Sequence, residues 1–368
     1  MKKYIYDKVG WTEMKIDTNQ LLEPLNSFYH AQGLLFGKLD ALGFDVQNEL
    51  LINAISDEVV TSSEIEGEHL DRSDVRSSVA RRLGLETAGL ENTYANHYTE
   101  GVVDMVLDAT RNYYNITEDR LFDWHCALFP TGRSGFQKIT VGAYRTGKME
   151  IVSGPSGKEH VHYVAPKPER VSDDMDVLLN WLEAYNDIDP YIKSAIAHLW
   201  FESIHPFDDG NGRIGRAISD HLLARAEKNA NRYYSLSSQL LKERKSYYNE
   251  LEVAQKYTGD LNRWVIWFIE CLTRAVLSSI TRLETAKQKA ALFDKLRNTA
   301  LNKRQNIMIN KLVDGFEGKL TTSKWAKLCK CSDDTALRDI DDLINKGVLL
   351  RSPEGGRSTA YLLNNNHM

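Results

Sequence analysis

Residues 205–216 contain the side chains with the clearest capacity for chemistry. They read His-Pro-Phe-Asp-Asp-Gly-Asn-Gly-Arg-Ile-Gly-Arg, so a histidine, two carboxylates and two arginines fall within one short stretch. A histidine side chain titrates close to neutral pH, which makes His205 a candidate general base. The carboxylate of Asp209 is a suitable ligand for a Mg²⁺ ion that bridges phosphates. The stretch therefore predicts a site for phosphate chemistry.

The elements on either side of this stretch predict that it forms a turn between two helices. Asp189-Pro190 is typical of a helix start, with the aspartate as cap and the proline in the first turn. The helix over 190–204 must end at His205, because Pro206 disfavours the α conformation in the residue before it. We expect a second helix over 211–227.

The start of this second helix is predicted to bind an anion. Gly210, Asn211 and Gly212 permit a tight turn with positive backbone dihedrals. Free N–H groups and the positive end of the helix dipole then favour phosphate. Arg213 and Arg216 share one face and can fork onto phosphate oxygens. A core histidine, a capping aspartate and solvated arginines are the structural alternatives, but together they do not explain so costly a turn.

The stretch resembles the motif of the Fic family, His-x-Phe-x-(Asp/Glu)-Gly-Asn-Gly-Arg-x-x-Arg, and matches it at every fixed position. The resemblance extends over about residues 90–260, with Trp124-His125, the segment Gly142-Ala-Tyr-Arg145 and Tyr247-Tyr248 among the matching features. It implies a mainly α fold, with an all-helical Fic core and a β-hairpin flap.

The resemblance also implies a reaction, the transfer of AMP from ATP to a Ser, Thr or Tyr hydroxyl of a target protein. His205 would take the proton from that hydroxyl, Phe207 would anchor the loop in the core, and Asp209 would ligate the Mg²⁺ held by the α- and β-phosphates. A family variant that phosphorylates its target departs from the motif around the glycines, and this sequence does not. ATP and Mg²⁺ are therefore the expected cofactors.

The remaining motif residues are expected to hold the phosphates. By resemblance, Gly210, Asn211 and Gly212 would cradle them with backbone N–H groups and the asparagine side chain. Arg213 and Arg216 would neutralise the pyrophosphate as it leaves. The attack on the α-phosphorus would be in line, and positioning and charge stabilisation would catalyse it.

Residues 148–164 form two short β-type runs around Gly154-Pro-Ser-Gly157, which predicts a hairpin. The hairpin occupies the place of the family's flap, which clamps the target segment by strand addition. An ordinary surface hairpin is the alternative. His160 and His162 suggest metal binding, but without a third ligand we interpret them as polar strand residues.

Glu66 lies at the end of the helix predicted over 46–66, where the helix dipole is unfavourable for a carboxylate. Beside the Fic motif, Ser62-Ser-Glu-Ile-Glu-Gly67 matches the family's inhibitory signature, (Ser/Thr)-x-x-x-Glu-(Gly/Asn). By resemblance, Glu66 pairs with Arg216 in the space that the γ-phosphate needs, and Ser62 tethers the helix. Some members use this glutamate to remove AMP again, so a deAMPylase or bifunctional enzyme remains an alternative.

The pattern changes near residue 300, where we place a domain boundary. Helices over 303–318, 321–328 and 332–346, then β-like runs over 348–351 and 359–363 joined by residues 354–357, follow the order of a winged helix. The expected domains are an N-terminal helical region with the inhibitory helix, a Fic core with trailing helices, and a small winged-helix domain, over residues 1–90, 91–300 and 301–368.

A DNA-binding role for the last domain is doubtful, because its reading helix is acidic. That helix carries one arginine, Arg338, against Asp333, Asp334, Asp339, Asp341 and Asp342. Such a helix repels phosphates, so we favour a protein-interaction or positioning role. A DNA-binding regulator with a nucleotide-sensing Fic core is the alternative from another class.

The composition is that of a globular, helical protein. The chain has 368 residues, 42% hydrophobic, and a net charge of −5. It shows no apolar run near the roughly 20 residues that span a bilayer, and its four cysteines fit reduced thiols in the cytoplasm. The target protein and the oligomeric state, a homo-oligomer included, stay open. The other helices expected in the first 300 residues cover 19–44, 95–113, 117–128, 171–186, 243–256 and 260–300.

Overall fold

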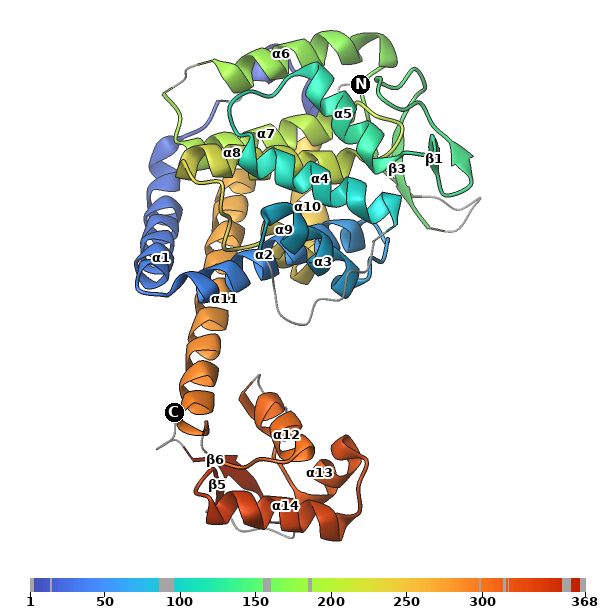
Figure 1. The fold of residues 1–368 in the computed structure, drawn as a ribbon. Helices are drawn as coiled ribbons and strands as arrows, with labels where there is room; N and C mark the ends of the chain where they lie inside the picture. The colour runs from blue at the N-terminus through green and yellow to red at the C-terminus, as the bar shows by residue number, and fades with distance from the viewer. Residues whose placement is uncertain are drawn as a thin grey trace. The chain divides into compact units, whose positions relative to one another are not determined.

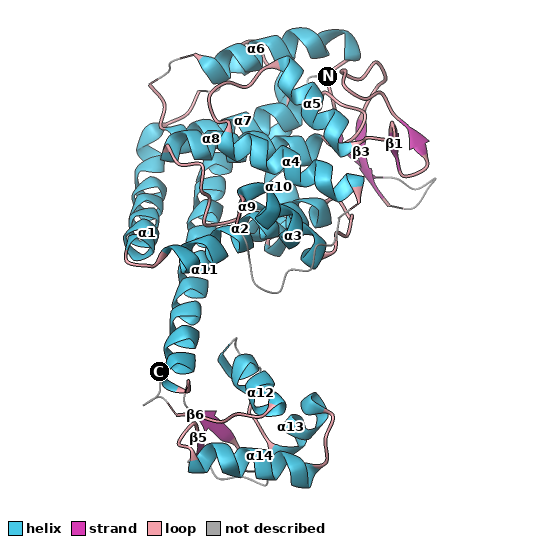
Figure 2. Cartoon of the chain, in the orientation of Figure 1, coloured by secondary structure: helices cyan, strands magenta, loops and turns pink. Residues whose placement is uncertain are grey.

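The computed structural model describes residues 3–13, 15–85, 96–154, 160–184, 187–297, 299–313, 316, 318–352 and 359–364. The described chain is mostly helical, as Figure 2 shows, which confirms the expected mainly α fold. It divides into two compact units, Met1–Ser279 and Ile280–Met368. The division lies inside a long helix and ahead of the boundary expected near residue 300, because that helix leaves the first core before it ends. The expected boundary at residue 90 lies outside the described residues.

The first unit contains the predicted helices with small shifts at their ends (Figure 1). Its elements are η1 Ile5–Asp7, η2 Trp11–Glu13, η3 Thr18–Leu21, α1 Leu22–Asp40, α2 Phe44–Ile65, α3 Arg72–Leu83, α4 His97–Arg111, α5 Glu118–Leu128, β1 Arg133–Ser134, β2 Gln137–Lys138, β3 Glu150–Ser153, β4 His160–Val164, η4 Pro168–Arg170, α6 Val171–Glu183, α7 Pro190–Ile204, α8 Asn211–Glu227, α9 Leu236–Lys242, α10 Arg244–Gln255 and most of α11 Leu261–Lys295.

Sequence patterns missed α3, α9 and the β1–β2 hairpin. The helix α3 is rich in arginine, so charge obscures its apolar face, and it starts at a cap in which the Asp71 side chain accepts from the N–H groups of Ser73 and Asp74. The helix α9 is seven residues long, too short for a periodic pattern. The strands β1 and β2 are two residues each.

The helix α7 forms the centre of the first unit. Every residue from Tyr191 to Ile204 is buried except Lys193, and α7 packs against α8 (Figure 1). The Trp264 indole of α11 donates to the Ala195 carbonyl of α7 at 2.8 Å. A helix that is buried on all sides is typical of the interior of a large domain. The loop that follows α7 therefore begins from a fixed point.

Among the described residues, α11 is the one helix long and apolar enough to cross a membrane by length and composition. Sequence analysis found no apolar run long enough to span a bilayer and missed α11, because charged residues such as Glu270 and Arg274 interrupt its apolar run. Trp264, Val265, Phe268 and its other apolar residues from Ile269 to Val276 contribute to the buried core of the first unit. Packing against other helices therefore accounts for its apolar character.

The second unit has its own small core around Trp325 and Ile340. Its elements are α12 Lys303–Val313, α13 Thr322–Cys329, α14 Asp333–Asn345, β5 Leu349–Arg351 and β6 Tyr361–Leu363. The strands pair antiparallel, and the order of elements is the expected one. Winged-helix identity stays a prediction, and the expected link over 354–357 lies outside the described residues.

The helix α14 presents fewer aspartates to solvent than its sequence suggests. Asp339 is buried, and it accepts from the guanidinium of Arg304 at 2.6 Å and from Asn302 at 2.8 Å. Asp342 pairs with Lys346, the residue that caps the end of α14. Two of the five acids therefore have a cation beside them within the small domain, which weakens the argument from charge repulsion.

Candidate active site

The loop between α7 and α8 begins at His205, which adopts a left-handed backbone conformation with φ of 51°. Such a conformation costs free energy in a residue other than glycine, and at functional sites it persists where neighbouring groups hold it. The sequence placed the positive dihedrals at the glycines, and Gly210 does have a φ of 82°. The strain at His205 is a further feature, and it fixes the direction in which the histidine leaves the helix.

The buried Arg145 side chain holds this strained turn in place. It donates to the carbonyl oxygens of His205 at 2.8 Å, Ile204 at 3.3 Å, Pro166 at 2.7 Å and Gly147 at 2.9 Å. An arginine carries five N–H donors in a rigid fork, so it can bind several carbonyls at once. The sequence singled out Arg145 by resemblance alone and assigned it no role.

The middle of the loop is anchored by Phe207, which is fully buried. The Asn211 side chain accepts from the Phe207 N–H at 2.9 Å and donates to the Phe207 carbonyl at 2.8 Å. The His125 ring stacks on Phe207 with centroids 4.3 Å apart. Asn211 was expected to contact phosphate with its side chain. In the structure, the side-chain amide bonds to the backbone of Phe207 within the loop. The backbone N–H of Asn211 stays at the start of α8.

The His125 ring also connects two segments of the site. Its Nδ1 lies 3.2 Å from the Gly142 N–H, which donates to it, so Nε2 carries the proton and donates to the Asp209 carbonyl at 3.2 Å. Burial lowers the pKa of His125 to about 4, so the ring is neutral at pH 7. His125 therefore braces the loop as a neutral ring.

The Asp209 carboxylate is oriented by two donors. The Ser134 hydroxyl of β1 contacts one oxygen, and the Gly210 N–H donates to the other at 2.6 Å. The neighbouring Asp208 accepts from the Thr140 N–H at 2.9 Å. The hairpin that sequence analysis missed thus positions the predicted Mg²⁺ ligand. The signal was present in Gly132 and Gly135, which flank the strand and both have positive φ.

The start of α8 is covered by the end of α2. The Glu66 carboxylate accepts from Arg216 Nη2 at 2.8 Å, and Arg216 also donates to the Ser62 hydroxyl at 2.9 Å and to the Ser62 carbonyl at 2.8 Å. A Cβ atom at Gly212 would lie 2.1 Å from Glu66 Oε1, so the carboxylate rests directly on the first turn of α8. The three residues named from the inhibitory signature and the motif are therefore in direct contact.

A second glutamate, which sequence analysis did not assign, pairs with the other motif arginine. Glu68 Oε2 lies 2.9 Å from Nη1 of Arg213, which also donates to the Tyr98 hydroxyl. The Arg213 side chain is 1% exposed and the Glu68 side chain 37%. The sequence has three acids here, Glu64, Glu66 and Glu68. It does not reveal which acid meets which arginine.

Burial and charge act against each other on these ion pairs. Burial raises the pKa of Glu68, Arg213 lowers it, and Asp209 and Glu66 raise it further, so the net shift is upward. Burial lowers the pKa of Arg216, but Glu66, Tyr247 and Tyr248 together raise it, and the net shift is upward. Arg216 is therefore a permanent buried cation, and its stability requires an anion at this position.

The predicted flap is the hairpin of β3 and β4, with an irregularity between Ile151 and Val152. The buried Tyr163 of β4 donates to the Ser203 carbonyl of α7 at 2.7 Å, which fixes the hairpin beside the turn at His205. His162 lies 3.0 Å from Glu252 and 2.6 Å from Ser153. The predicted turn residues 155–157 lie outside the described residues.

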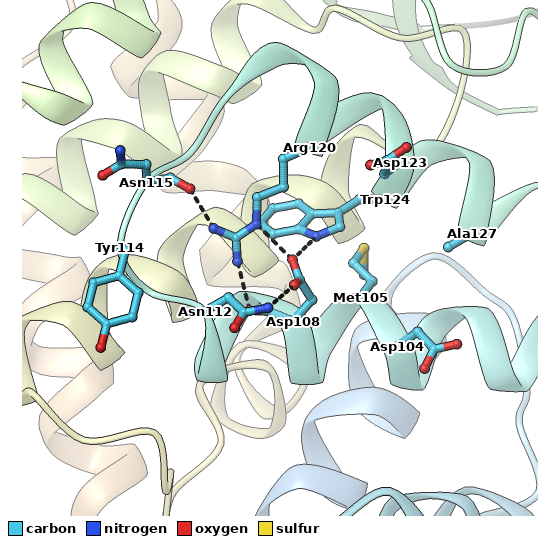
Figure 3. Close-up of a pocket in the computed structure, with 10 residues that line it drawn as sticks. All are labelled: Asp104, Met105, Asp108, Asn112, Tyr114, Asn115, Arg120, Asp123, Trp124 and Ala127. Atoms are coloured by element: carbon cyan, nitrogen blue, oxygen red, sulfur yellow. Dashed lines mark hydrogen bonds and ion pairs between the residues drawn. The ribbon is translucent and has the colours of Figure 1, made fainter.

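A pocket of about 520 Å³ is lined by residues of α4, α5 and the segment between them (Figure 3). Asp108 accepts there from Arg120 at 2.7 Å, from the Trp124 indole at 2.7 Å and from Asn112 at 2.6 Å. These contacts join the two helices and hold none of the predicted site residues. Among the described residues, we find no group of three histidine, cysteine or acidic side chains that could hold a metal by itself.

Comparison with known proteins identifies two segments. Residues 115–223 match the sequence model of the Fic/DOC family, and residues 4–85 match that of DUF4172, a domain of unknown function. A crystal structure of a Fic family protein from Desulfovibrio desulfuricans G20 superposes with a TM-score of 0.55 at 21% identity, over 95% of this chain and 98% of that one. This likeness shows a shared fold.

Two curated relatives each match a part of the chain. A probable protein adenylyltransferase of Aquifex aeolicus is 33% identical over an alignment of 114 residues. The alignment covers 26% of this chain and 36% of the relative. A uridine 5'-monophosphate transferase of Xanthomonas campestris pv. campestris is 34% identical over 119 residues, 30% of this chain and 21% of the relative. The alignments thus span much less than half of either relative. The loop at 205–216 lies inside the matched segment, so residues 115–223 form a Fic domain.

Proposed function

We propose that this protein transfers AMP from ATP to a Ser, Thr or Tyr hydroxyl of a target protein, itself included, and that Glu66 restrains the transfer through Arg216. One observation carries the proposal. The Glu66 carboxylate, an anion, lies on the first turn of α8 and bonds to the buried Arg216. A helix start with a buried arginine is a site for a phosphate group, and a carboxylate in the same place competes with it.

The reaction follows from the residues around this site. The hydroxyl oxygen of the target bonds to the α-phosphorus as the bond to pyrophosphate breaks, and His205 accepts the hydroxyl proton. Arg213 and Arg216 stabilise the charge that develops on the leaving pyrophosphate. The first N–H groups of α8 lie outside its own hydrogen bonding and can hold phosphate oxygens.

The residues present fit a magnesium ion that arrives with the nucleotide. Asp209 offers one carboxylate, which Ser134 and the Gly210 N–H orient, and Mg²⁺ in nucleotide sites is commonly held by one or two carboxylates and the phosphates. Such an ion would neutralise charge on the α- and β-phosphates. Since one oxygen of Asp209 accepts from Ser134, we expect Ser134 to orient the ligand.

Incubation with labelled ATP tests the proposal. The Glu66→Gly protein, incubated with ATP labelled at the α-phosphate, is expected to incorporate label into itself, whereas ATP labelled at the γ-phosphate leaves none. The His205→Ala change in the same background removes the incorporation. Label from the γ-phosphate would indicate phosphorylation and contradict the proposal, as would the absence of any incorporation.

Two alternatives have specific support. One aligned relative is named a uridine 5'-monophosphate transferase, so UTP labelled at the α-phosphate belongs in the same assay, and preferential incorporation from UTP would replace AMP by UMP. The second is removal of AMP, because Glu66 is a carboxylate beside the phosphate site and can orient water there. Loss of label from AMP-modified protein with wild type, but not with Glu66→Gln, would favour it.

A further inference from the structure

Glu202, in the last turn of α7, faces the predicted general base from inside the protein. Its Oε2 lies 3.6 Å from Nδ1 of His205, and the side chain is 7% exposed. This distance is longer than a hydrogen bond. Among the described residues, neither His205 Nδ1 nor Glu202 Oε1 has a hydrogen-bond partner. An unpartnered donor site and an unpartnered acceptor therefore face each other in the core.

Of the other described side chains near Glu202, both ring nitrogens of His198 are engaged, whereas Arg216 keeps one nitrogen, Nη1, without a partner. His198 of α7 lies 2.9 Å from the Ser219 hydroxyl at Nδ1 and 2.9 Å from the Tyr247 hydroxyl of α10 at Nε2, and burial lowers its pKa to about 4. Arg216 of α8 donates to Ser62 and Glu66. His205 is therefore the neighbour whose ring nitrogen is still free to bond with the carboxylate.

The carboxylate of Glu202 is ionised despite its burial. Burial raises its pKa, but His205, His198 and Arg216 lower it, and the net shift is downward. A buried carboxylate with an unsatisfied oxygen costs several kcal/mol unless a donor approaches it. The His205 backbone is held by Arg145, so a small rotation of the imidazole is enough to close the gap.

We propose that Glu202 is the positioning residue of His205, bonding its Nδ1–H and thereby turning Nε2 toward the target hydroxyl. This inference rests on the proposed function, because it assigns the tautomer that a general base needs there. When Nε2 accepts the hydroxyl proton, the ring becomes an imidazolium whose Nδ1–H still faces the carboxylate. Glu202 stays ionised and stabilises that charge, and it does not touch the nucleotide.

Two substitutions separate the charge of Glu202 from its hydrogen bond. In the Glu66→Gly background, Glu202→Gln keeps an acceptor and removes the charge, and Glu202→Met removes both. We expect kcat to fall about tenfold for the glutamine variant and about a hundredfold for the methionine variant, with the KM for ATP unchanged, because general base catalysis is worth roughly 10²–10⁴ in rate. Equal kcat in all three proteins would overturn the proposal.

Nitrogen NMR of the histidine rings tests the same inference without any turnover. In wild type above pH 8, the His205 signals, assigned with His205→Ala, are expected to show a protonated Nδ1 and a bare Nε2. In Glu202→Met this preference should be lost. A protonated Nε2 in wild type would refute the proposal even if AMP transfer is real, and the expected tautomer would support it even if no transfer is found.

A matched control uses another glutamate–histidine pair of the first unit. Glu252 lies 3.0 Å from Nδ1 of His162, so Glu252→Gln removes a similar charge at another histidine. The His162 ring signals should change, and those of His205 should not. A change at His205 of the size seen in the Glu202 variants would show that the effect is not specific to Glu202, and it would contradict the proposal.

Discussion

Replacing Glu66 by glycine removes one of the three hydrogen bonds that Arg216 makes within the end of α2, and it leaves the two bonds to Ser62. A hydrogen bond between charged groups contributes about 1.5–3 kcal/mol, and every 1.4 kcal/mol is tenfold in an equilibrium. The Glu66 side chain is 31% exposed. Solvent therefore screens the pair with Arg216, and the free energy lost lies toward the lower end of this range. We therefore expect the rate of AMP incorporation to rise about ten- to a hundredfold.

The assay compares initial rates of α-phosphate incorporation in wild type, Glu66→Gly and a matched control, Glu64→Gly. Glu64 lies in the last turn of α2, two residues before the C-cap residue Glu66, so its replacement loosens the end of the helix without freeing Arg216, at a cost of about 1 kcal/mol of helix stability. The control should incorporate label at the wild-type rate. If Glu66→Gly bound ATP in calorimetry but labelled no faster than wild type, the inhibitory role of Glu66 would be wrong.

Three further outcomes are expected. His205→Ala should lower transfer by roughly 10²–10⁴ while ATP binding persists, and loss of ATP binding in calorimetry would assign His205 a structural role instead. In a gel-shift titration at physiological salt, the full chain should bind random duplex DNA weakly, whereas nanomolar binding to a defined site would favour the DNA-binding regulator. Burial lowers the pKa of three histidines, His125, His198 and His221, to about 4. The melting temperature should therefore fall between pH 7.5 and pH 5, because these histidines bind protons below about pH 6.5 in the unfolded chain but only below about pH 4 in the folded chain. An unchanged melting temperature would contradict these low pKa values.

The parts of the site that follow from local backbone chemistry were predictable. Pro206 forces α7 to end, and Gly210 permits the turn before α8, so both helix limits agree with the sequence. The contact between Glu66 and Arg216 was predicted as well, but from a family signature, since the two residues are 150 positions apart. Their roles in transfer and inhibition stay predictions.

The supports of the site could not be predicted, because they depend on distant segments that meet only in the folded chain. Arg145, His125 and Ser134 carry no pattern that distinguishes a brace from a surface residue, and each contacts a partner at least 60 positions away in the loop. Glu68 is similar, since any of three neighbouring acids could meet Arg213. Asp339 shows the reverse error, in which a residue counted as surface charge proved to be buried.

The helix that ends at Glu66 is also a wall of the core, and this limits how the proposed inhibition can be relieved. Ile52, Val59 and Ile65 of α2 are fully buried, and Glu58 accepts from the Ser235 hydroxyl at 2.7 Å and the Ser237 N–H at 3.1 Å. Exposing each such apolar side chain costs about 1.5–3 kcal/mol, so withdrawing the whole helix costs more than the ion pair is worth. Relief by a partner or a second subunit therefore has to act on the final turn alone, and a truncation that deletes α2 would report on unfolding instead of activation.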